Sequence, residues 1–366
     1  MLSACCFFRY REAYWMEEKI RIAVDAMGGD HAPGEIVKGV IKAVNRKKDL
    51  SVVLVGRQEE IAACLNGQAY PQGSISVRNA QEVIGMAEHP VEAVRTKKDS
   101  SLCVALGMVK RGEADACISA GNSGAVLVGG QGIVGRIRGV KRPPFASVMP
   151  TQQGGMMLLD CGANVDARPE HLAQWAKLGS IYMQYVEGIQ NPRVGIVNIG
   201  AEEEKGNALV KETFPLLKEM DEKGIIRFTG SLEARDIPCG PCDVAVCDGF
   251  VGNVVIKMYE GVAKVLLAEV KEGIYSSTMS KLGGLMIKGA LKETLKKFDA
   301  SRYGGAPLLG LKSLVVKMHG SAKAAEVENA LYQCMQFYRQ DITGKTAMFA
   351  GEEKAQADAE RSQDGI

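Results

Sequence analysis

Short apolar runs alternate with amphipathic segments along most of the chain. The runs are rich in β-branched and aliphatic residues, which is typical of strands that are covered on both faces. We expect strands over 20–26, 51–56, 74–80, 114–120, 145–150, 156–162, 193–200, 225–230 and 243–249. The intervening segments repeat apolar residues at helical spacing and predict helices over 34–47, 101–111, 122–138, 169–189, 203–222 and 251–274. This alternation favours βαβ units and a mainly parallel sheet.

The runs at 145–150 and 156–162 are joined by the short turn TQQGG, which predicts a hairpin and would make the sheet mixed. The expected fold is a three-layer α/β/α domain over 19–343. Residues 1–18 are interpreted as an N-terminal extension, with Met16 as an alternative start of the protein. Residues 344–366 are polar and are expected to be a disordered tail.

Gly-rich polar turns separate an apolar run from a helical segment at several places. They occur at 26–33, 119–125, 160–170, 198–207, 247–253 and 303–310. Glycine lets a backbone approach a ligand closely, and a helix that opens after such a turn favours an anion. Because turns at the carboxyl ends of parallel strands converge on one crevice, we expect an anion site there, most simply a phosphate site.

The segment 276–298 departs from this rhythm. Its lysines, Lys281, Lys288, Lys292 and Lys296, fall on one helical face, and apolar residues cover most of the rest. A basic amphipathic helix can lie on an anionic membrane surface. The same pattern also suits a helix that packs on its own core or on a partner subunit. Both interpretations stay open on the pattern alone.

Composition excludes several classes of protein. The 366 residues carry 45 basic and 43 acidic side chains, and this balance gives no reason to expect a nucleic-acid partner. No apolar run approaches the roughly 20 residues that span a bilayer. Among the 10 cysteines, Cys239 and Cys242 form a CGPC sequence, but the next residues read as a strand rather than a helix. A redox pair is therefore not expected. The four histidines are distant in sequence from these cysteines and from one another, so a metal site is not expected either.

Other motifs are ambiguous. A GxGxxG sequence at 130–135 lies inside a predicted helix, which argues against nicotinamide binding. The cations of the RTKKDSS segment suit either a phosphate or solvent. Asn122, Ser123 and Asn164 could donate to an anion or make local turn bonds. No arrangement of nucleophile and base is evident, so an acyl-transfer reaction would use a nucleophile that belongs to the substrate.

Seven motifs, taken together, are similar to one family. They are AVDAMGGDHAP, RTKKDSS, ADACISAGNSGA, LLDCGANVDARPEHL, NPRVGIVNIGAEEEKGN, VAVCDGFVGNVVIK and YGGAPLLG. From about Ile20 to about Tyr338 the chain resembles the bacterial acyl-carrier-protein:phosphate acyltransferases, the PlsX family. Its CGPC sequence and its extension before Met16 have no counterpart in that pattern. The resemblance implies a fold like those of phosphate acetyltransferases and of isocitrate and isopropylmalate dehydrogenases.

The resemblance also implies a reaction and its partners. Acyl-carrier protein and inorganic phosphate would give acyl phosphate and free carrier, without a metal or other cofactor. The acyl phosphate would feed a membrane glycerol-3-phosphate acyltransferase in phospholipid synthesis. The protein would be a cytoplasmic homodimer at the inner face of the cell membrane. The membrane-contact residues would be Lys281, Leu282, Met286, Lys288, Leu291, Lys292 and Leu295.

The site is expected where the Gly-rich turns meet. Candidate catalytic residues are Asn122, Ser123, Lys97, Lys98 and His319. Candidate residues for binding phosphate and substrate are Gly28, Gly29, Asp30, Gly124, Asn164, Lys205, Asp248, Asn253, Arg302 and Gly304. The acidic carrier would meet a basic patch at Arg136, Arg138, Lys141 and Arg142. The alternatives are a phosphotransacetylase-like enzyme acting on acyl-CoA, a dehydrogenase of related fold, and a non-catalytic partner that only binds the carrier.

Overall fold

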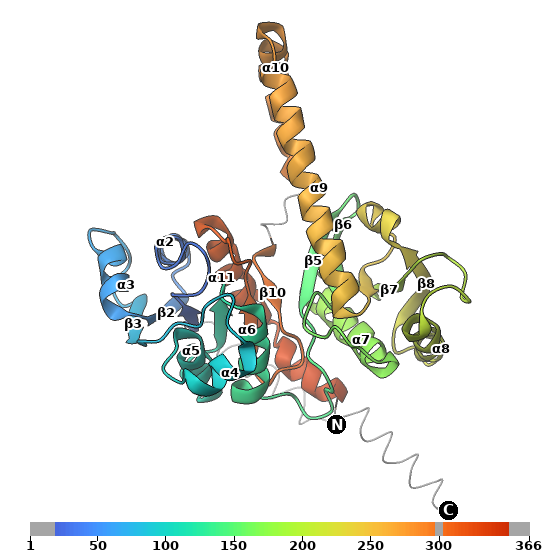
Figure 1. Ribbon diagram of the computed structural model, residues 1–366, viewed down its shortest axis with the longest axis horizontal. Helices are drawn as coiled ribbons and strands as arrows, with labels where there is room; N and C mark the ends of the chain where they lie inside the picture. The colour runs from blue at the N-terminus through green and yellow to red at the C-terminus, as the bar shows by residue number, and fades with distance from the viewer. Residues whose placement is uncertain (1–18, 297–302, 351–366) are drawn as a thin grey trace, which may run out of the picture. The chain divides into compact units, whose positions relative to one another are not determined.

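The computed structural model describes residues 19–296 and 303–350, which form two compact units (Figure 1). Unit 1 comprises 19–143 and 303–350, and unit 2 comprises 144–296. The boundary between them falls inside the stretch 19–343, for which the sequence predicts one domain. Each unit has an α/β architecture with its own sheet.

Unit 1 contains a six-stranded sheet in the order β10-β11-β4-β1-β2-β3. Its strands are β1 (Ile20–Asp25), β2 (Leu50–Gly56), β3 (Ile75–Asn79), β4 (Ala116–Ser119), β10 (Ala306–Pro307) and β11 (Leu314–Lys317). Neighbouring strands are parallel, except that β10 is antiparallel to β11. Its helices are α2 (Gly34–Arg46), α3 (Gln58–Leu65), α4 (Pro90–Thr96), α5 (Ser101–Lys110), α6 (Ser123–Gly129) and α11 (Ala324–Arg339).

The central strands of unit 1 are covered on both faces. Ile22, Ala23 and Val24 are consecutive in β1, and all three are inaccessible to solvent. Helices α2 and α11 pack together over one face, and α5 packs against β1, β2 and β4 on the other (Figure 1). Burial on both faces explains why the strands read as continuous apolar runs rather than as alternating patterns.

Unit 2 contains a five-stranded sheet in the order β5-β6-β9-β7-β8. Its strands are β5 (Ala146–Thr151), β6 (Gly154–Leu159), β7 (Arg193–Asn198), β8 (Arg227–Glu233) and β9 (Val244–Val246). Strands β5 and β6 form the predicted antiparallel hairpin, and the other pairs are parallel. Its helices are α7 (Pro169–Tyr185), α8 (Ala208–Glu222), α9 (Gly249–Tyr275) and α10 (Thr278–Lys296). The mixed, mostly parallel sheets in both units confirm the predicted fold class.

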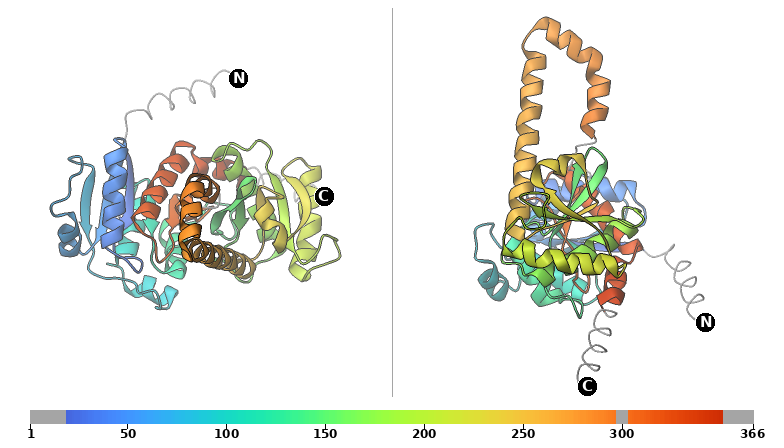
Figure 2. Two further views of the ribbon diagram at one scale, coloured as in Figure 1. Left: turned by 90° about the horizontal axis from the view of Figure 1, so that it is seen from above. Right: turned by 90° about the vertical axis from the view of Figure 1, so that its right-hand side faces the viewer.

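Helices α9 and α10 form a long hairpin of unit 2 (Figure 2). The first turns of α9 pack on the sheet, where Val251, Val255 and Tyr259 contact a buried cluster that includes Met156 and Leu158. Further along, the two helices approach closely, since a Cβ atom on Gly284 would lie 2.4 Å from Ile274 Cγ2. Most apolar side chains of the distal hairpin are exposed. None of the helices described here has the length and apolarity that crossing a membrane requires.

The predicted strands are all present, but several segments differ from expectation. The segment 122–138 is predicted to be one helix. In the structure an α-helix ends at Gly129 and a π-helical turn follows from Gly130 to Val134. The helical conformation stops there because Gly135 adopts φ +90°. The helix predicted over 203–222 begins at Ala208, where Asn207 caps it. Strands β10 and β11 and helices α3, α4 and α11 were not predicted.

The C-terminal boundary also differs. Residues 342–350 are helical, and Thr346 and Ala350 within them are buried. Disorder from residue 344 is therefore wrong for this part of the predicted tail. The extension 1–18, with Met16, and the remainder of the tail, 351–366, lie outside the described residues.

Candidate functional site

Two polar side chains connect the carboxyl ends of β1 and β4 in unit 1. The Ser119 hydroxyl donates to Asp25 Oδ2 over 2.6 Å and accepts from the Gly121 amide over 3.0 Å. The Met27 amide donates to Asp25 Oδ1 over 3.2 Å. Burial raises the pKa of Asp25, and these hydrogen bonds oppose that rise. The network fixes the turns that follow β1 and β4 to each other.

The turn after β1 is packed so tightly that it requires glycine. A Cβ atom on Gly28 would lie 2.5 Å from Asp25 Oδ2 and 2.7 Å from the Gly121 nitrogen. Gly29 adopts φ +100°, and the next amide, of Asp30, donates to Gly320 O over 2.8 Å. The 26–30 turn is thereby held between the turns that follow β4 and β11.

Asn122 is buried at this edge, but local contacts use its side chain. Its Oδ1 accepts from the Ala125 amide at the start of α6, and its Nδ2 donates to Met86 O and Glu88 O, each over 3.0 Å. Asn122 therefore positions the 85–88 loop. Ser123, the next residue, is exposed, so its hydroxyl is accessible to a ligand. Gly124 packs on Pro90.

The two predicted lysines lie beside this loop. Lys97 Nζ donates to Glu88 Oε1 over 2.6 Å and to Val83 O over 2.8 Å. This contact lowers the pKa of Glu88. Lys98 Nζ donates to Val94 O over 3.0 Å at the end of α4. Both ammonium groups thus have protein partners.

Lys317, which belongs to none of the sequence motifs, ends β11 at the same edge. It is only 9% exposed. Its Nζ donates to Ala120 O over 3.3 Å and also to Met318 O. Burial lowers the pKa of Lys317 to about 8, while Asp25 and Asp30 act in the opposite direction. In the sequence, the sign of this site is that a single charged residue, Lys317, directly follows the apolar run LVV.

Two further predicted residues belong to unit 1. His319 is exposed, and its Nδ1 accepts from the Ser321 amide over 3.2 Å. Gly304 adopts φ +70° and would place a Cβ atom 2.5 Å from the Ala330 nitrogen, so it serves close packing on α11. Arg302 lies outside the described residues.

A second polar network lies at the carboxyl edge of the sheet in unit 2. Asp160, which follows β6, is fully buried and accepts from the amides of Phe145, Ala163 and Asn164 over 2.6–3.2 Å, and from Asn164 Nδ2 over 2.9 Å. Burial raises its pKa. Asn164 O accepts from the Gly249 amide over 2.8 Å, which ties the loop to the start of α9.

The other predicted residues of unit 2 follow β7 and β9 in the chain. Asp248 caps α9, because its Oδ1 accepts from the amides of Phe250 and Val251 over 2.9 Å. Asn253 follows on α9 beside Gly162. Lys205 is half exposed and lies 3.5 Å from Glu202. Most of the predicted site residues thus fall into two sets, one near the carboxyl edge of each sheet, whereas Gly304 packs on α11.

The two cysteines of CGPC differ in burial: Cys239 is exposed, whereas Cys242 packs in the core of unit 2. Cys239 ends a 3₁₀ turn, and Cys242 is buried before β9, where burial raises its pKa to about 12. A reactive thiol needs the opposite shift. Within residues 19–296 and 303–350, no three His, Cys, Asp or Glu side chains are grouped to hold a metal ion.

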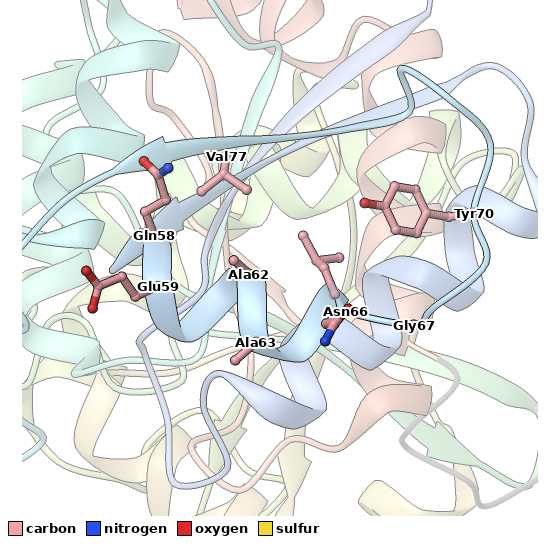
Figure 3. Close-up of a pocket in the computed structure, with 9 residues that line it drawn as sticks. Gln58, Glu59, Ala62, Ala63, Asn66, Gly67, Tyr70 and Val77 are labelled. Carbon is pink, nitrogen blue, oxygen red and sulfur yellow. The ribbon is translucent and has the colours of Figure 1, made fainter.

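A shallow, open depression lies between α3 and β3 of unit 1 (Figure 3). Apolar and uncharged polar residues such as Ala62, Tyr70 and Val77 form most of its wall, and Glu59 is its one carboxylate. It contains none of the residues that form the carboxyl-edge networks. We therefore place the candidate site at the Gly-rich turns rather than in this depression.

Comparison with known proteins identifies the family. A family model described as "Fatty acid synthesis protein" matches residues 20–345. The chain is 50% identical over 317 residues to a phosphate acyltransferase of Desulfitobacterium hafniense, covering 85% of this chain and 92% of the relative. It is 48% identical over 324 residues to the phosphate acyltransferase of Bacillus licheniformis, covering 88% and 96%.

Solved structures support the fold. The EutD phosphotransacetylase of Staphylococcus aureus aligns with a TM-score of 0.57 at 14% identity, covering 91% of this chain and 98% of that one. A phosphotransacetylase of Streptococcus pyogenes aligns with a TM-score of 0.55 at 17% identity, covering 96% and 100%. At this identity the likeness concerns the fold alone. The sequence matches carry the assignment: the chain belongs to the phosphate acyltransferase family.

Proposed function

We propose that this enzyme moves a fatty acyl group from acyl-carrier protein to inorganic phosphate and so makes acyl phosphate for phospholipid synthesis. The observation that carries the proposal is the unit 1 edge, where the 26–30 turn is locked between the turns after β4 and β11. Such turns suit a small anion. Membership of the phosphate acyltransferase family supports phosphate as that anion.

The proposed reaction needs no protein nucleophile. An oxygen of monohydrogen phosphate attacks the thioester carbonyl carbon, a C–O bond forms and the C–S bond breaks. The phosphate proton passes to the departing thiolate, which leaves as the carrier thiol. The protein holds the phosphate and the oxyanion that develops on the carbonyl. The exposed Ser123 hydroxyl and the Gly29 amide are the proposed donors in unit 1.

An acyl-CoA substrate is the alternative. The test supplies the purified enzyme with phosphate and either palmitoyl-carrier protein or palmitoyl-CoA, and quantifies acyl phosphate as its hydroxamate. We expect product mainly from the carrier thioester. Product from CoA alone would establish the alternative, and no product from either would refute both.

We propose that the carrier docks on the basic loop of unit 1 formed by Arg136, Arg138, Lys141 and Arg142. All four residues are exposed, and Lys312 lies beside Gly135 at the base of this loop. Several cations on one short loop suit an acidic partner, mainly by speeding association.

Arg138→Glu is therefore expected to raise the KM for acyl-carrier protein about three- to tenfold, with the effect shrinking at high salt. Lys110→Glu, an equal charge change at an exposed position of α5, is the control and should leave KM unchanged. Equal behaviour of the two variants would rule this loop out as the docking site.

We propose that the α9–α10 hairpin contacts the membrane and that the protein works as a homodimer at the inner face of the cell membrane. There it would deliver acyl phosphate to a membrane glycerol-3-phosphate acyltransferase. Support comes from the exposed apolar residues of α10: Leu282 is 58% exposed and Met286 is 82% exposed. The helix also exposes three lysines, Lys281, Lys288 and Lys292. Leu291 is half-buried and Leu295 is 36% exposed. A basic, apolar helix of this kind suits an anionic lipid surface.

Met286→Glu should markedly reduce co-flotation of the protein with phosphatidylglycerol vesicles, because a charge replaces an apolar contact. Met348→Glu changes a comparably exposed methionine of unit 1 and serves as the control. Sedimentation of both variants reports the oligomeric state. Unchanged flotation together with loss of the dimer would assign the surface to subunit contact instead.

A further inference from the structure

We propose that the ammonium group of Lys317 binds the attacking phosphate. This inference rests on the function proposed above and adds a phosphate ligand that the sequence motifs did not indicate. Of the two buried lysines among the described residues, Lys177 lies within α7, whereas Lys317 lies at the carboxyl edge of a sheet. That edge is where the Gly-rich turns of unit 1 meet.

Strand pairing fixes the position of Lys317. It pairs with Ser119 in the parallel register of β11 and β4, and the Met318 amide donates to Ser119 O over 2.9 Å. Ser119 in turn holds Asp25. The base of the Lys317 side chain is therefore anchored to the same network that fixes the turns after β1 and β4.

The ammonium group of Lys317 can donate one more hydrogen bond than the protein accepts from it. It carries three hydrogens. Two carbonyl oxygens, of Ala120 and Met318, accept from it, and no carboxylate among the described residues forms an ion pair with it. One donor is therefore left for a ligand at the point where the 317–321 turn meets the 26–30 turn.

The charge of Lys317 also lacks a close counterion. The charged groups that act on it are Asp25 and Asp30, and Asp25 is already bonded to Ser119 and to the Met27 amide. Asp30 and His319 are exposed to solvent. A buried cation without a paired anion is costly, and a bound phosphate dianion would supply that pairing.

The test compares Lys317→Met, which keeps an unbranched side chain and removes the ammonium group, with Lys42→Met at an exposed position of α2. Initial rates are measured against phosphate at saturating palmitoyl-carrier protein. We expect Lys317→Met to raise the KM for phosphate about 10- to 100-fold, as loss of a charged hydrogen bond implies, with the KM for the carrier unchanged. Lys42→Met should match wild type, and Lys317→Arg should recover part of the affinity.

Two readouts keep this inference separate from the reaction itself. Phosphate should raise the thermal unfolding temperature of wild type and of Lys42→Met, but not of Lys317→Met, whether or not the protein turns over a carrier thioester. If Lys317→Met fails to fold, the wild-type KM for phosphate decides: it should rise as the pH passes about 8, because the lysine then loses its proton. The assignment would be overturned if Lys317→Met bound phosphate as tightly as wild type. It would also be overturned if the wild-type KM for phosphate did not change between pH 7 and pH 9, which is about one pH unit on either side of the lysine pKa.

Discussion

Gly252→Ala is expected to destabilise unit 2 by about 2–4 kcal/mol, among the largest effects of any single methyl group in this chain. A Cβ atom at Gly252 would lie 1.9 Å from the carbonyl oxygen of Asp160. That oxygen belongs to the backbone of the buried loop that follows β6, so it cannot rotate away as a side chain would. The start of α9 would have to move off the sheet, which breaks the contact between Asn164 and Gly249.

Gly261→Ala is the matched control for this prediction. It lies nine residues further along the same helix, where an added Cβ meets no atom within 4 Å. Alanine should stabilise the helix there by about 0.5–1 kcal/mol. Urea denaturation, combined with hydrogen exchange over 249–275, measures both variants. If they shift stability in the same direction, α9 does not dock on the 160–164 loop as described.

Gly28→Ala should lower kcat/KM by about 100-fold, because positioning errors near 1 Å have effects of this size. The added Cβ would strike Asp25 Oδ2 at 2.5 Å and the Gly121 nitrogen at 2.7 Å. The turn after β1 must then separate from the turn after β4. Both the backbone of Gly29 and the surroundings of Lys317 would shift with it.

Gly34→Ala serves as the control because it opens α2 only six residues later and has no atom within 4 Å of its added Cβ. Its kinetics should match those of wild type. Circular dichroism establishes that both variants are folded before rates are compared. A Gly28→Ala enzyme within twofold of wild type would remove the 26–30 turn from the candidate site.

Much of the fold follows from local pattern. Strands such as β1 and β7 read as continuous apolar runs because helices cover both faces of their sheets, and these were predicted. Helix α11 was not, although its buried Val327, Leu331 and Cys334 have helical spacing. The division into two units depends on contacts between distant segments, since 303–350 returns to join 19–143. No local pattern carries that information.

The candidate site was predicted only in part, for a related reason. Glycine turns are visible in sequence because the close packing at Gly28 and the positive φ of Gly29 both require glycine. The partner of a polar side chain is not visible. The sequence leaves Asn122 either as a donor to an anion or as a residue with local turn bonds, and in the structure its amide group donates to the carbonyls of Met86 and Glu88. Lys317 lies outside every predicted strand, and only the pairing of β11 with β4 buries it beside the turns.

The central claim is that phosphate itself attacks the carrier thioester, and one measurement tests it most directly. Enzyme and palmitoyl-carrier protein are mixed in equimolar amounts in phosphate-free buffer, and the release of the free carrier thiol is followed by mass spectrometry of the carrier. We predict no thiol release until phosphate is added, and then one acyl phosphate for each thiol. A stoichiometric burst of thiol without phosphate would show an acyl group transferred to the protein, and would contradict the account.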